Sequence, residues 1–250
     1  MDTIIFEGEQ ELSPIMKDIY RRVRTNIELT GLENRIICVT SCMKDDGKST
    51  VSYQLARSFA DKSKTVLFVD ADMRNSSMLS RMGVNGKPLD LSQFLSGQVK
   101  LEQVIYKTSV PDFYFLPTGK FPAAPTELLS KPRFHNMIEK FRETFDYVFI
   151  DTPPIGAVVD SIVVAQECDG SVLVVPANTI SRRVVADYAA QLRRANSNLL
   201  GVVLNKVDEK SGRYGYGYGY GRKYGYEYGY GYGYGYGAEY GHSDAAKEEK

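Results

Sequence analysis

The chain has 250 residues, and its 31 Lys and Arg balance its 31 Asp and Glu, so the formal net charge at pH 7 is zero. That balance gives no argument for nucleic acid or an anionic membrane as a partner, and three cysteines are too few and too irregularly spaced for a disulfide framework or a zinc site. The sequence shows no signal-peptide pattern and no apolar run near the ~20 residues that cross a bilayer, so we expect a cytoplasmic protein that reaches a membrane through a partner.

Apolar segments of helix and strand type alternate along the chain. The first is a predicted helix over "SPIMKDIYRRVRTNIEL", with Ser13 as its N-cap and Pro14 in its first position. A strand buried on both faces is predicted at "RIICVTS", and further strands are predicted, in chain order, at "TVLFVDAD", "FYFLPTG", "DYVFIDTPP", "GSVLVVP" and "LLGVVLN". Further helices are predicted at "GKSTVSYQLARSFADK", at the end of "FPAAPTELLS" and at "SRRVVADYAAQLRRAN".

The order of these elements indicates the fold class. Strand, helix and strand at this spacing predict an α/β, doubly wound, mostly parallel sheet with helices on both faces. Such sheets bind ligands beyond the carboxyl ends of their strands. Periodicity alone does not order the elements between about residues 75 and 140, a segment that also contains "LSQFLSG".

The segment "CMKDDGKST", residues 42–50, lies between a predicted strand and a predicted helix. From Gly47 onward it matches G-x-x-x-x-G-K-[ST], in which backbone N–H groups at a helix N-terminus hold phosphate. We expect Lys48 over the β- and γ-phosphates, the Ser49 hydroxyl on Mg²⁺ and Thr50 near the α-phosphate. The predicted nucleotide-binding residues of this loop are Met43, Lys44, Asp45, Asp46, Gly47, Lys48, Ser49 and Thr50.

The loop departs from the pattern, because Cys42 stands at the first glycine position and no glycine separates it from Gly47. The carboxylates of Asp45 and Asp46 are unfavourable beside a triphosphate unless they point outward, although aspartate tolerates the positive φ that such a loop needs. We interpret Cys42 as a small residue that fits, with a redox-sensitive thiol at a helix N-terminus as the alternative.

Three aspartates close predicted strands. Asp70 and Asp72 lie two residues apart, and in an extended chain both carboxylates point to the same side. Asp151 ends another strand in the manner of a Walker B aspartate, which holds Mg²⁺ through water. A single aspartate in such a place is normally a turn former, but three of them beside a phosphate loop predict a Mg²⁺-nucleotide site.

The last strand ends in "VLNKVD", residues 203–208. The pattern N-K-x-D is typical of GTPases that bind guanine through the aspartate, but four residues match by chance often. In dimeric P-loop ATPases the same strand supplies an asparagine that contacts adenine. We favour Asn205 as the residue that contacts the base, and Asp208 keeps GTP as an alternative.

Taken together, these segments resemble the bacterial tyrosine kinases, or BY-kinases, of capsule and exopolysaccharide systems, over nearly the whole chain. The resemblance rests on GKST, on "VLFVDADMR" as a Walker A′ motif, on "VFIDTPP" as a Walker B motif, on "LSQFLSG" and "PTELL", and on a C-terminal tyrosine cluster. It implies an ATP- and Mg²⁺-dependent tyrosine autokinase on a P-loop NTPase-type fold. Consistently, the sequence contains no G-x-G-x-x-G loop, H-R-D or D-F-G of eukaryotic-type kinases.

The resemblance also implies a role for each matching residue. Lys48 would bind phosphate, and Ser49 with Asp151 would organise Mg²⁺. Asp70 would accept the tyrosine proton, with Asp72 near the metal, although the choice of base between these two stays open. The three form the predicted catalytic set, Lys48, Asp70 and Asp72.

An assembly motif and partners follow from the same resemblance. The segment "DIYRRVR" resembles the family's E-x-x-R-x-x-R motif, with Asp18 in place of Glu beside Arg21 and Arg24. The motif implies a ring-like homo-oligomer, with an octamer as one candidate. The shorter side chain of Asp18 would weaken the contact between subunits. The alternative is that the segment is a solvated amphipathic helix with no role in assembly. The family's split arrangement implies a separate transmembrane activator that regulates polysaccharide chain length, and a tyrosine phosphatase.

The C-terminal segment holds 12 of the 18 tyrosines, most of them flanked by glycine, and its composition predicts disorder. A phenol with a pKa near ~10 needs a carboxylate base to attack phosphorus, and a flexible tail of about 40 residues reaches ~32–38 Å, enough for a neighbouring subunit. Phosphorylation adds ~1.5–2 negative charges per tyrosine and is expected to loosen the ring. The expected phosphoacceptors are Tyr214, Tyr216, Tyr218, Tyr220, Tyr224, Tyr226, Tyr228, Tyr230, Tyr232, Tyr234, Tyr236 and Tyr240.

We therefore expect an N-terminal segment with an assembly helix over residues 1–33, a P-loop kinase domain over 34–210 and a tyrosine-rich tail over 211–250. One rival is a MinD/ParA-like switch ATPase, whose signature lysine falls at Met43 here, with Lys44 one residue off. The others are a GTPase and, for the tail alone, an adhesive low-complexity segment.

Overall fold

The computed structural model describes residues 2–7, 11–84, 86–119, 121–195 and 198–207. Asp208 and the twelve expected phosphoacceptors lie outside the described residues. No helix in the described ranges combines the length and the apolar character that crossing a membrane requires.

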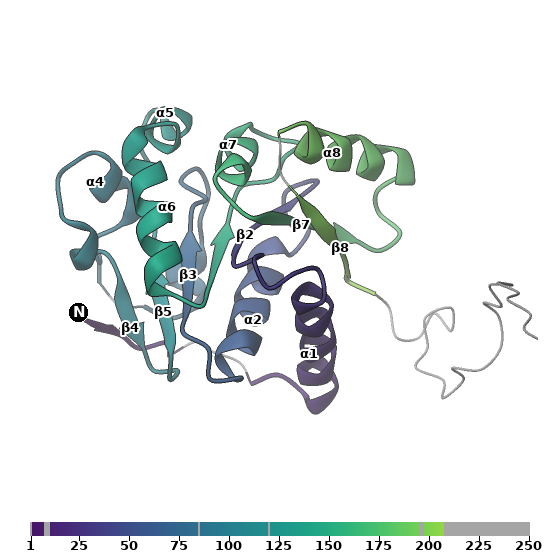
Figure 1. Ribbon diagram of the computed structural model, residues 1–250, viewed down its shortest axis with the longest axis horizontal. Coiled ribbons are helices and arrows are strands. Elements are labelled where there is room, and N and C mark those ends of the chain that lie inside the picture. The colour runs from purple at the N-terminus through teal and green to yellow at the C-terminus, as the bar shows by residue number, and fades with distance from the viewer. Residues whose placement is uncertain (1, 8–10, 85, 120, 196–197, 208–250) are drawn as a thin grey trace, which may run out of the picture. The chain divides into compact units, whose positions relative to one another are not determined.

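The described chain contains one sheet of eight strands in the order β1-β4-β5-β3-β6-β2-β7-β8 (Figure 1). Every neighbouring pair is parallel except β4 with β5, which is antiparallel. The strands are β1 Thr3–Ile4, β2 Ile36–Ser41, β3 Val66–Asp70, β4 Tyr106–Thr108, β5 Phe113–Leu116, β6 Tyr147–Asp151, β7 Gly170–Pro176 and β8 Leu199–Asn205. The helices are α1 Pro14–Glu28, α2 Lys48–Ala60, α3 Met78–Arg81, α4 Leu91–Leu95, the 3₁₀ helix η1 Leu101–Gln103, α5 Pro125–Leu129, α6 Pro132–Thr144, α7 Asp160–Gln166 and α8 Arg182–Arg194.

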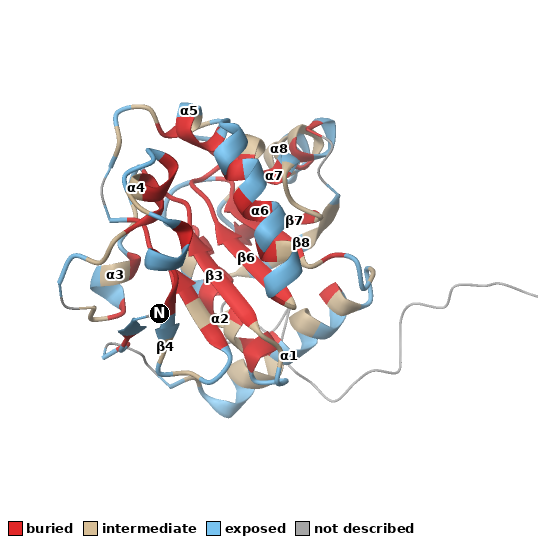
Figure 2. Cartoon of the chain, turned by 60° about the vertical axis from the view of Figure 1, so that its left-hand side comes forward, coloured by how far each residue is buried: buried red, intermediate tan, exposed pale blue. Residues whose placement is uncertain are grey.

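The central strands are buried on both sides because helices cover both faces of the sheet. Alternate residues of β2 face opposite ways: Ile36 and Cys38 pack in the cluster beneath α4 to α8, and Ile37 and Val39 pack in the cluster beneath α1 and α2. Figure 2 shows the buried strands β3 and β6 between these helices. Such strands appear in the sequence as continuous apolar runs, which is why their pattern predicted them.

All six predicted strands and the four predicted helices are confirmed. Ser13 caps α1 as expected: its hydroxyl accepts the N–H of Met16 at 3.3 Å, and Pro14 occupies the first position. The segment that periodicity left unordered contains α4, whose N-cap Asp90 and Gln93 form a reciprocal capping box. It also contains the start of α6, a helix of 13 residues that the sequence analysis missed.

Candidate active site

Three strand ends meet at one edge of the sheet. Strand β6 lies between β3 and β2, all three are parallel, and the register places Asp70 directly beside Asp151. Strand β2 runs into the loop of residues 42–47, and α2 begins immediately after it at Lys48. The carboxyl edge therefore holds the predicted phosphate loop and the strand-end aspartates together, as the motif positions indicated.

The loop forms without its usual glycines because Asp45 supplies a left-handed residue. Asp45 has φ +63° and Gly47 has φ +90°. The side chain of Asp45 is exposed, whereas the carboxylate of Asp46 points into the loop. Its Oδ2 accepts the N–H of Met43 at 2.8 Å, and the residue is buried. The Asp46 carboxylate thus holds the loop closed on its inner side by accepting a backbone N–H of the same loop. Burial raises the pKa of Asp46.

Cys42 is buried at the start of the loop. Burial, followed by the nearby Asp46 charge, raises the pKa of the Cys42 thiol to about 11. The side chain is a protonated thiol near neutral pH, so it is a small loop residue and not a redox-reactive thiolate.

Lys48 lies at the centre of the carboxylate group. Its Nζ is 3.0 Å from Asp72 Oδ2, 3.5 Å from Asp151 Oδ2 and 3.1 Å from Ser49 Oγ. Burial opposes the charge of the ammonium, but the carboxylates of Asp151 and Asp72 outweigh it and raise the pKa of Lys48. Lys48 therefore joins the phosphate loop to Asp151, which ends β6, and to Asp72, which follows β3.

Asp70 and Asp72 both lie at the site and make different contacts, and the expectation that both carboxylates face one Mg²⁺-nucleotide stays a prediction. Strand β3 ends at Asp70, so Asp72 belongs to the loop that follows. The Asp70 carboxylate accepts the hydroxyl of Ser76 and, at 3.2 Å, the N–H of Asp72. The Asp72 carboxylate instead contacts Lys48 and accepts the N–H of Asn75 at 3.1 Å.

The buried carboxyls carry perturbed acidities. Burial, with the neighbouring Asp151 charge next, raises the pKa of Asp70 well above its usual value. Burial also raises the pKa of Asp151, although Lys48 opposes the change. Neither aspartate has more than 1% of its surface exposed. A buried strand-end carboxyl with a raised pKa binds a proton more tightly than an exposed aspartate, which makes it a candidate acid or base.

The residues at the site fit a hydrated Mg²⁺ ion. Asp151 Oδ1 is buried and has no hydrogen-bond partner among the described residues, so one oxygen lone pair at the strand edge is unsatisfied. The Ser49 hydroxyl and the Asp72 carboxylate add hard oxygen donors beside Lys48. No described cluster of three His, Cys, Asp or Glu side chains is placed to hold a metal alone, and Mg²⁺ typically combines one or two carboxylates with phosphate oxygens and water.

A cavity of about 210 Å³ opens onto these groups. Asp72 contributes to its wall, whereas Asp70 and Asp151 lie behind it. The wall residues are Lys44, Asp45, Gly47, Lys48, Ser49, Asp72, Arg74, Asn75, Ser77, Arg81, Pro153, Pro154, Ala157 and Val158. Thr50 is exposed nearby, and its hydroxyl lies 2.5 Å from Arg81 Nη2.

Strand β8 ends against the phosphate loop. Asn205 Nδ2 donates to the carbonyl of Asp46 at 2.9 Å, and Lys206 Nζ donates to the carbonyl of Asp45 at 2.5 Å. Glycine suits position 47 because its φ of +90° strains other residues, and a Cβ there would lie 2.2 Å from Asn205 Nδ2, which would have to shift. Asn205 thus contacts the phosphate loop, and its contact with a base stays a prediction.

Arg74 joins the loop after β3 to two other elements. Its Nε donates to Asp160 Oδ2 at 2.7 Å and its Nη2 to Asp160 Oδ1 at 3.0 Å, and Nη2 also donates to Thr126 Oγ1 at 3.0 Å. The Thr126 hydroxyl donates to Asp160 as well, at 2.5 Å. Sequence reasoning missed this Arg74 clamp: the arginine follows the quoted aspartates, but its partner is 86 residues away and has no local signal.

The three residues of the assembly motif lie on α1 but not in one contact. Asp18 pairs with Arg22 at 2.7 Å, on an exposed surface. Arg24 donates to the carbonyl of Ser58 on α2. Arg21 lines a separate groove of about 400 Å³ between α1 and α2. Their part in assembly stays a prediction.

Comparison with known proteins supplies the context of this site. Residues 34–198 match the family described as "AAA domain". Tyrosine-protein kinase CpsD of Streptococcus agalactiae is 42% identical over 199 residues, which span 80% of this chain and 87% of that protein. The kinase domain of the Escherichia coli tyrosine kinase ETK superimposes with a TM-score of 0.73 at 30% identity, over 86% of this chain and 80% of that one.

The septum site-determining protein MinD of Pyrococcus horikoshii, solved with Mg-ADP, has a TM-score of 0.59 at 24% identity, over 68% of this chain and 69% of that one. That identity shows a common fold and no more. The expected P-loop NTPase-type fold is therefore confirmed.

Proposed function

This chain belongs to the bacterial tyrosine-protein kinases, and from that premise we propose that it phosphorylates its own C-terminal tyrosines with ATP and Mg²⁺, between copies in a ring. The observation that supports the proposal most directly is the single edge at which Lys48, Asp72 and Asp151 meet. The final strand ends at the same edge, since Asn205 and Lys206 bond to the phosphate loop. The last described residues of the chain therefore lie close to the place where phosphate would bind.

The loop residues divide the binding work. Backbone N–H groups at the start of α2 and the Lys48 ammonium hold the phosphates, and Lys48 exchanges carboxylate contacts for phosphate oxygens when the nucleotide enters. The Ser49 hydroxyl and the Asp151 carboxylate would hold Mg²⁺, with Asp72 beside it, and a bound ion would supply positive charge against the phosphoryl oxygens. Asn205 contacts the adenine base from the end of β8.

The phosphoryl step needs a base for the phenol. The tyrosine oxygen attacks the γ-phosphorus, the bond from that phosphorus to the bridging oxygen breaks, and ADP leaves with the electron pair. Asp70 receives the phenolic proton, because burial raises the pKa of its carboxyl, so it binds a proton more tightly than an exposed aspartate does. Asp70 is fully buried beneath Ser76, so the incoming phenol takes the place of the Ser76 hydroxyl.

We place the chain in the control of capsular or exopolysaccharide synthesis, on the inner side of the membrane. A separate transmembrane protein activates it there, a tyrosine phosphatase reverses the modification, and α1 with Asp18, Arg21 and Arg24 joins the copies. The resemblance to the family supports this arrangement.

Mass spectrometry of residues 211–250 tests the proposal after incubation with ATP, with and without a candidate membrane activator. We expect phosphotyrosine in the wild type, none in Lys48→Met, and an unchanged level in the control Lys107→Met, an exposed lysine on β4 far along the sheet order. ATP turnover with an unmodified tail would instead establish a switch ATPase, and turnover of GTP but not ATP, with an unmodified tail, would establish a GTPase that binds guanine through Asp208.

A further inference from the structure

Two consecutive side chains at the end of β8 hold the phosphate loop from outside the catalytic cavity. Asn205 Nδ2 donates to the carbonyl of Asp46 at 2.9 Å, and Lys206 Nζ donates to the carbonyl of Asp45 at 2.5 Å. Asp45 and Gly47 line the cavity, whereas Asn205 and Lys206 do not. The end of β8 therefore fixes two successive carbonyl groups of the loop without entering the space where phosphate would bind.

The geometry of the peptide group turns these two contacts into a constraint on two donors. In a planar trans peptide, the C=O of one residue and the N–H of the next point in opposite directions. Because the carbonyls of Asp45 and Asp46 point toward the end of β8, the N–H groups of Asp46 and Gly47 point away from it. Neither N–H donates to another residue in the described part of the chain. Both are therefore available to an anion at the start of α2.

The backbone of Lys206 has an unusual conformation at this contact. Its φ of +54° lies in the left-handed region, which lysine rarely adopts. Such residues persist where the surrounding structure holds them, and they gather at ligand sites. The preceding residue is fixed by β7, because the N–H of Ala177 donates to the carbonyl of Asn205 at 2.8 Å. The strand end thus maintains the Lys206 contact against a local conformational cost.

Lys206 also supplies a charge that suits an anion site in this loop. The Asp46 carboxylate is buried within the loop, where its negative charge would oppose a phosphate. Burial raises the pKa of Asp46, whereas the N–H of Met43 and the charge of Lys206 lower it. The Lys206 ammonium is therefore close enough to offset part of the Asp46 charge.

We propose that Asn205 and Lys206 are positioning residues for phosphate binding, which hold the N–H groups of Gly47 and Asp46 in the direction of the bound phosphates. Without them, rotation of either peptide plane would aim a carbonyl oxygen at the phosphate in place of an N–H donor. This role of the N-K pair in "VLNKVD" does not depend on which base the nucleotide carries. The inference rests on the proposed nucleotide site and extends it to a residue, Lys206, that lies outside the cavity.

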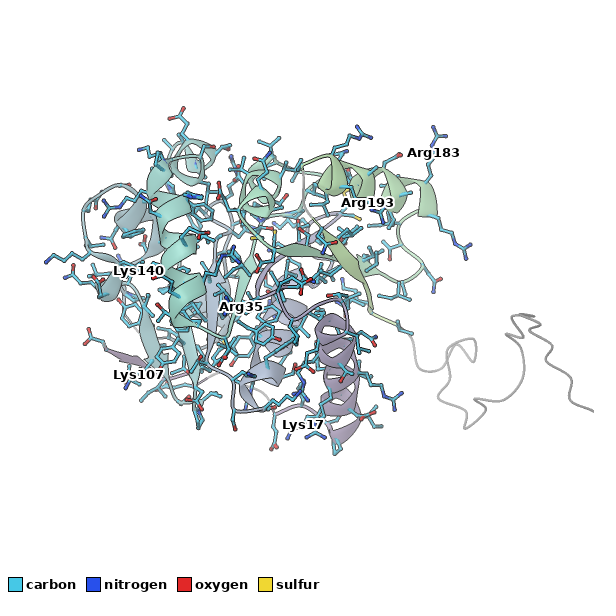
Figure 3. All side chains as sticks on the ribbon, in the orientation of Figure 1. Lys17, Arg35, Lys107, Lys140, Arg183 and Arg193 are labelled. Atoms are coloured by element: carbon cyan, nitrogen blue, oxygen red, sulfur yellow. The ribbon has the colours of Figure 1, made fainter. Side chains whose placement is uncertain are left out.

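Isothermal titration calorimetry of the full chain with Mg²⁺ tests the proposal, with pyrophosphate and ADP as separate ligands. Pyrophosphate has no base, so its affinity reports on the phosphate loop alone. Lys206→Met and Asn205→Leu each remove one donor at similar side-chain size, and Lys206→Arg returns a cationic donor. The control is Lys107→Met, which removes an exposed charge from β4, near the other end of the sheet from β8 (Figure 3).

We expect Lys206→Met and Asn205→Leu each to weaken pyrophosphate binding about tenfold, because each loses one hydrogen bond that holds the loop. Lys206→Met should weaken ADP binding by the same factor, Lys206→Arg should restore most of the affinity, and Lys107→Met should bind like the wild type. Lys206→Gly separates positioning from stability, because glycine adopts a positive φ without strain. It should bind pyrophosphate as weakly as Lys206→Met, with a urea midpoint equal to or above that of the wild type.

The positioning role is wrong if Lys206→Met binds pyrophosphate like the wild type, or if Lys107→Met loses as much affinity. It is also wrong if Asn205→Leu weakens the binding of ADP but not of pyrophosphate, since Asn205 would then act on the base alone. A wild type that binds neither ligand would instead reject the proposed nucleotide site itself.

Discussion

The Arg74–Asp160 ion pair tests whether the stability cost of removing one partner depends on how deeply the remaining partner is buried. Asp160 has no exposed surface, whereas the Arg74 side chain is 38% exposed. Removing the arginine leaves a carboxylate inside the protein with, among the described residues, only the Thr126 hydroxyl as a side-chain donor. Removing the charge of the aspartate leaves a guanidinium that water can still reach. The two substitutions therefore should not cost the same.

The magnitudes follow from the burial of each partner. Arg74→Met should lower the free energy of unfolding by about 3 kcal/mol, the lower end for breaking a buried pair, since the start of α7 also favours a negative charge. Asp160→Asn should cost about 1 kcal/mol, because the amide oxygen still accepts a hydrogen bond and the arginine stays solvated. The double variant should lower the free energy of unfolding by less than the sum of the two single variants, because removing both partners leaves no unpaired charge in the protein.

Urea unfolding at neutral pH without nucleotide measures all three variants, with Arg183→Met, an exposed arginine on α8, as the control. Because Arg74 follows Asp72 by two residues, both single variants should also reduce autophosphorylation by loosening the Asp72 loop. An Asp160→Asn variant as unstable as Arg74→Met, or more so, would refute the reasoning from burial.

Other substitutions test further parts of the structure. Gly47→Ala should lower the free energy of unfolding by about 2 kcal/mol and abolish ATP binding, because the new Cβ displaces Asn205. Gly97 is the control, because it also has a positive φ (+81°) but open space around it. Gly97→Ala should lower the free energy of unfolding, measured with urea, by only about 1 kcal/mol of backbone strain. The raised pKa of Asp70 means that the folded protein binds a proton more tightly than the unfolded chain, so apo stability should fall as pH rises through that pKa. Asp70→Asn should remove this slope, and a stability difference from wild type that is constant with pH contradicts the assignment. Asp90→Ala should cost about 1–2 kcal/mol through loss of the α4 capping box, measured by thermal unfolding, with kinase activity retained; no loss of stability would contradict the capping role.

One missed helix has a clear signal in the sequence. Helix α6 buries Phe134, Met137, Ile138 and Phe141, a spacing of helical period that the sequence shows directly. Strands β1 and β4 have two and three residues, too few for a periodic signal. The short α7 begins at Asp160, whose importance comes from Arg74 and not from its own neighbours.

The primary sequence alone determined the sheet, the phosphate loop and the position of the aspartates. Buried parallel strands are continuous apolar runs, and the carboxyl ends of neighbouring parallel strands meet at one edge whatever the details of packing. Only the tertiary structure decided which group each carboxylate contacts. Asp46 turns inward to Met43, Asp72 leaves the strand to reach Lys48, and Arg74 binds a partner 86 residues away. These contacts, and the pKa values that follow from them, depend on burial and on segments distant in the chain, which local patterns of residues do not encode.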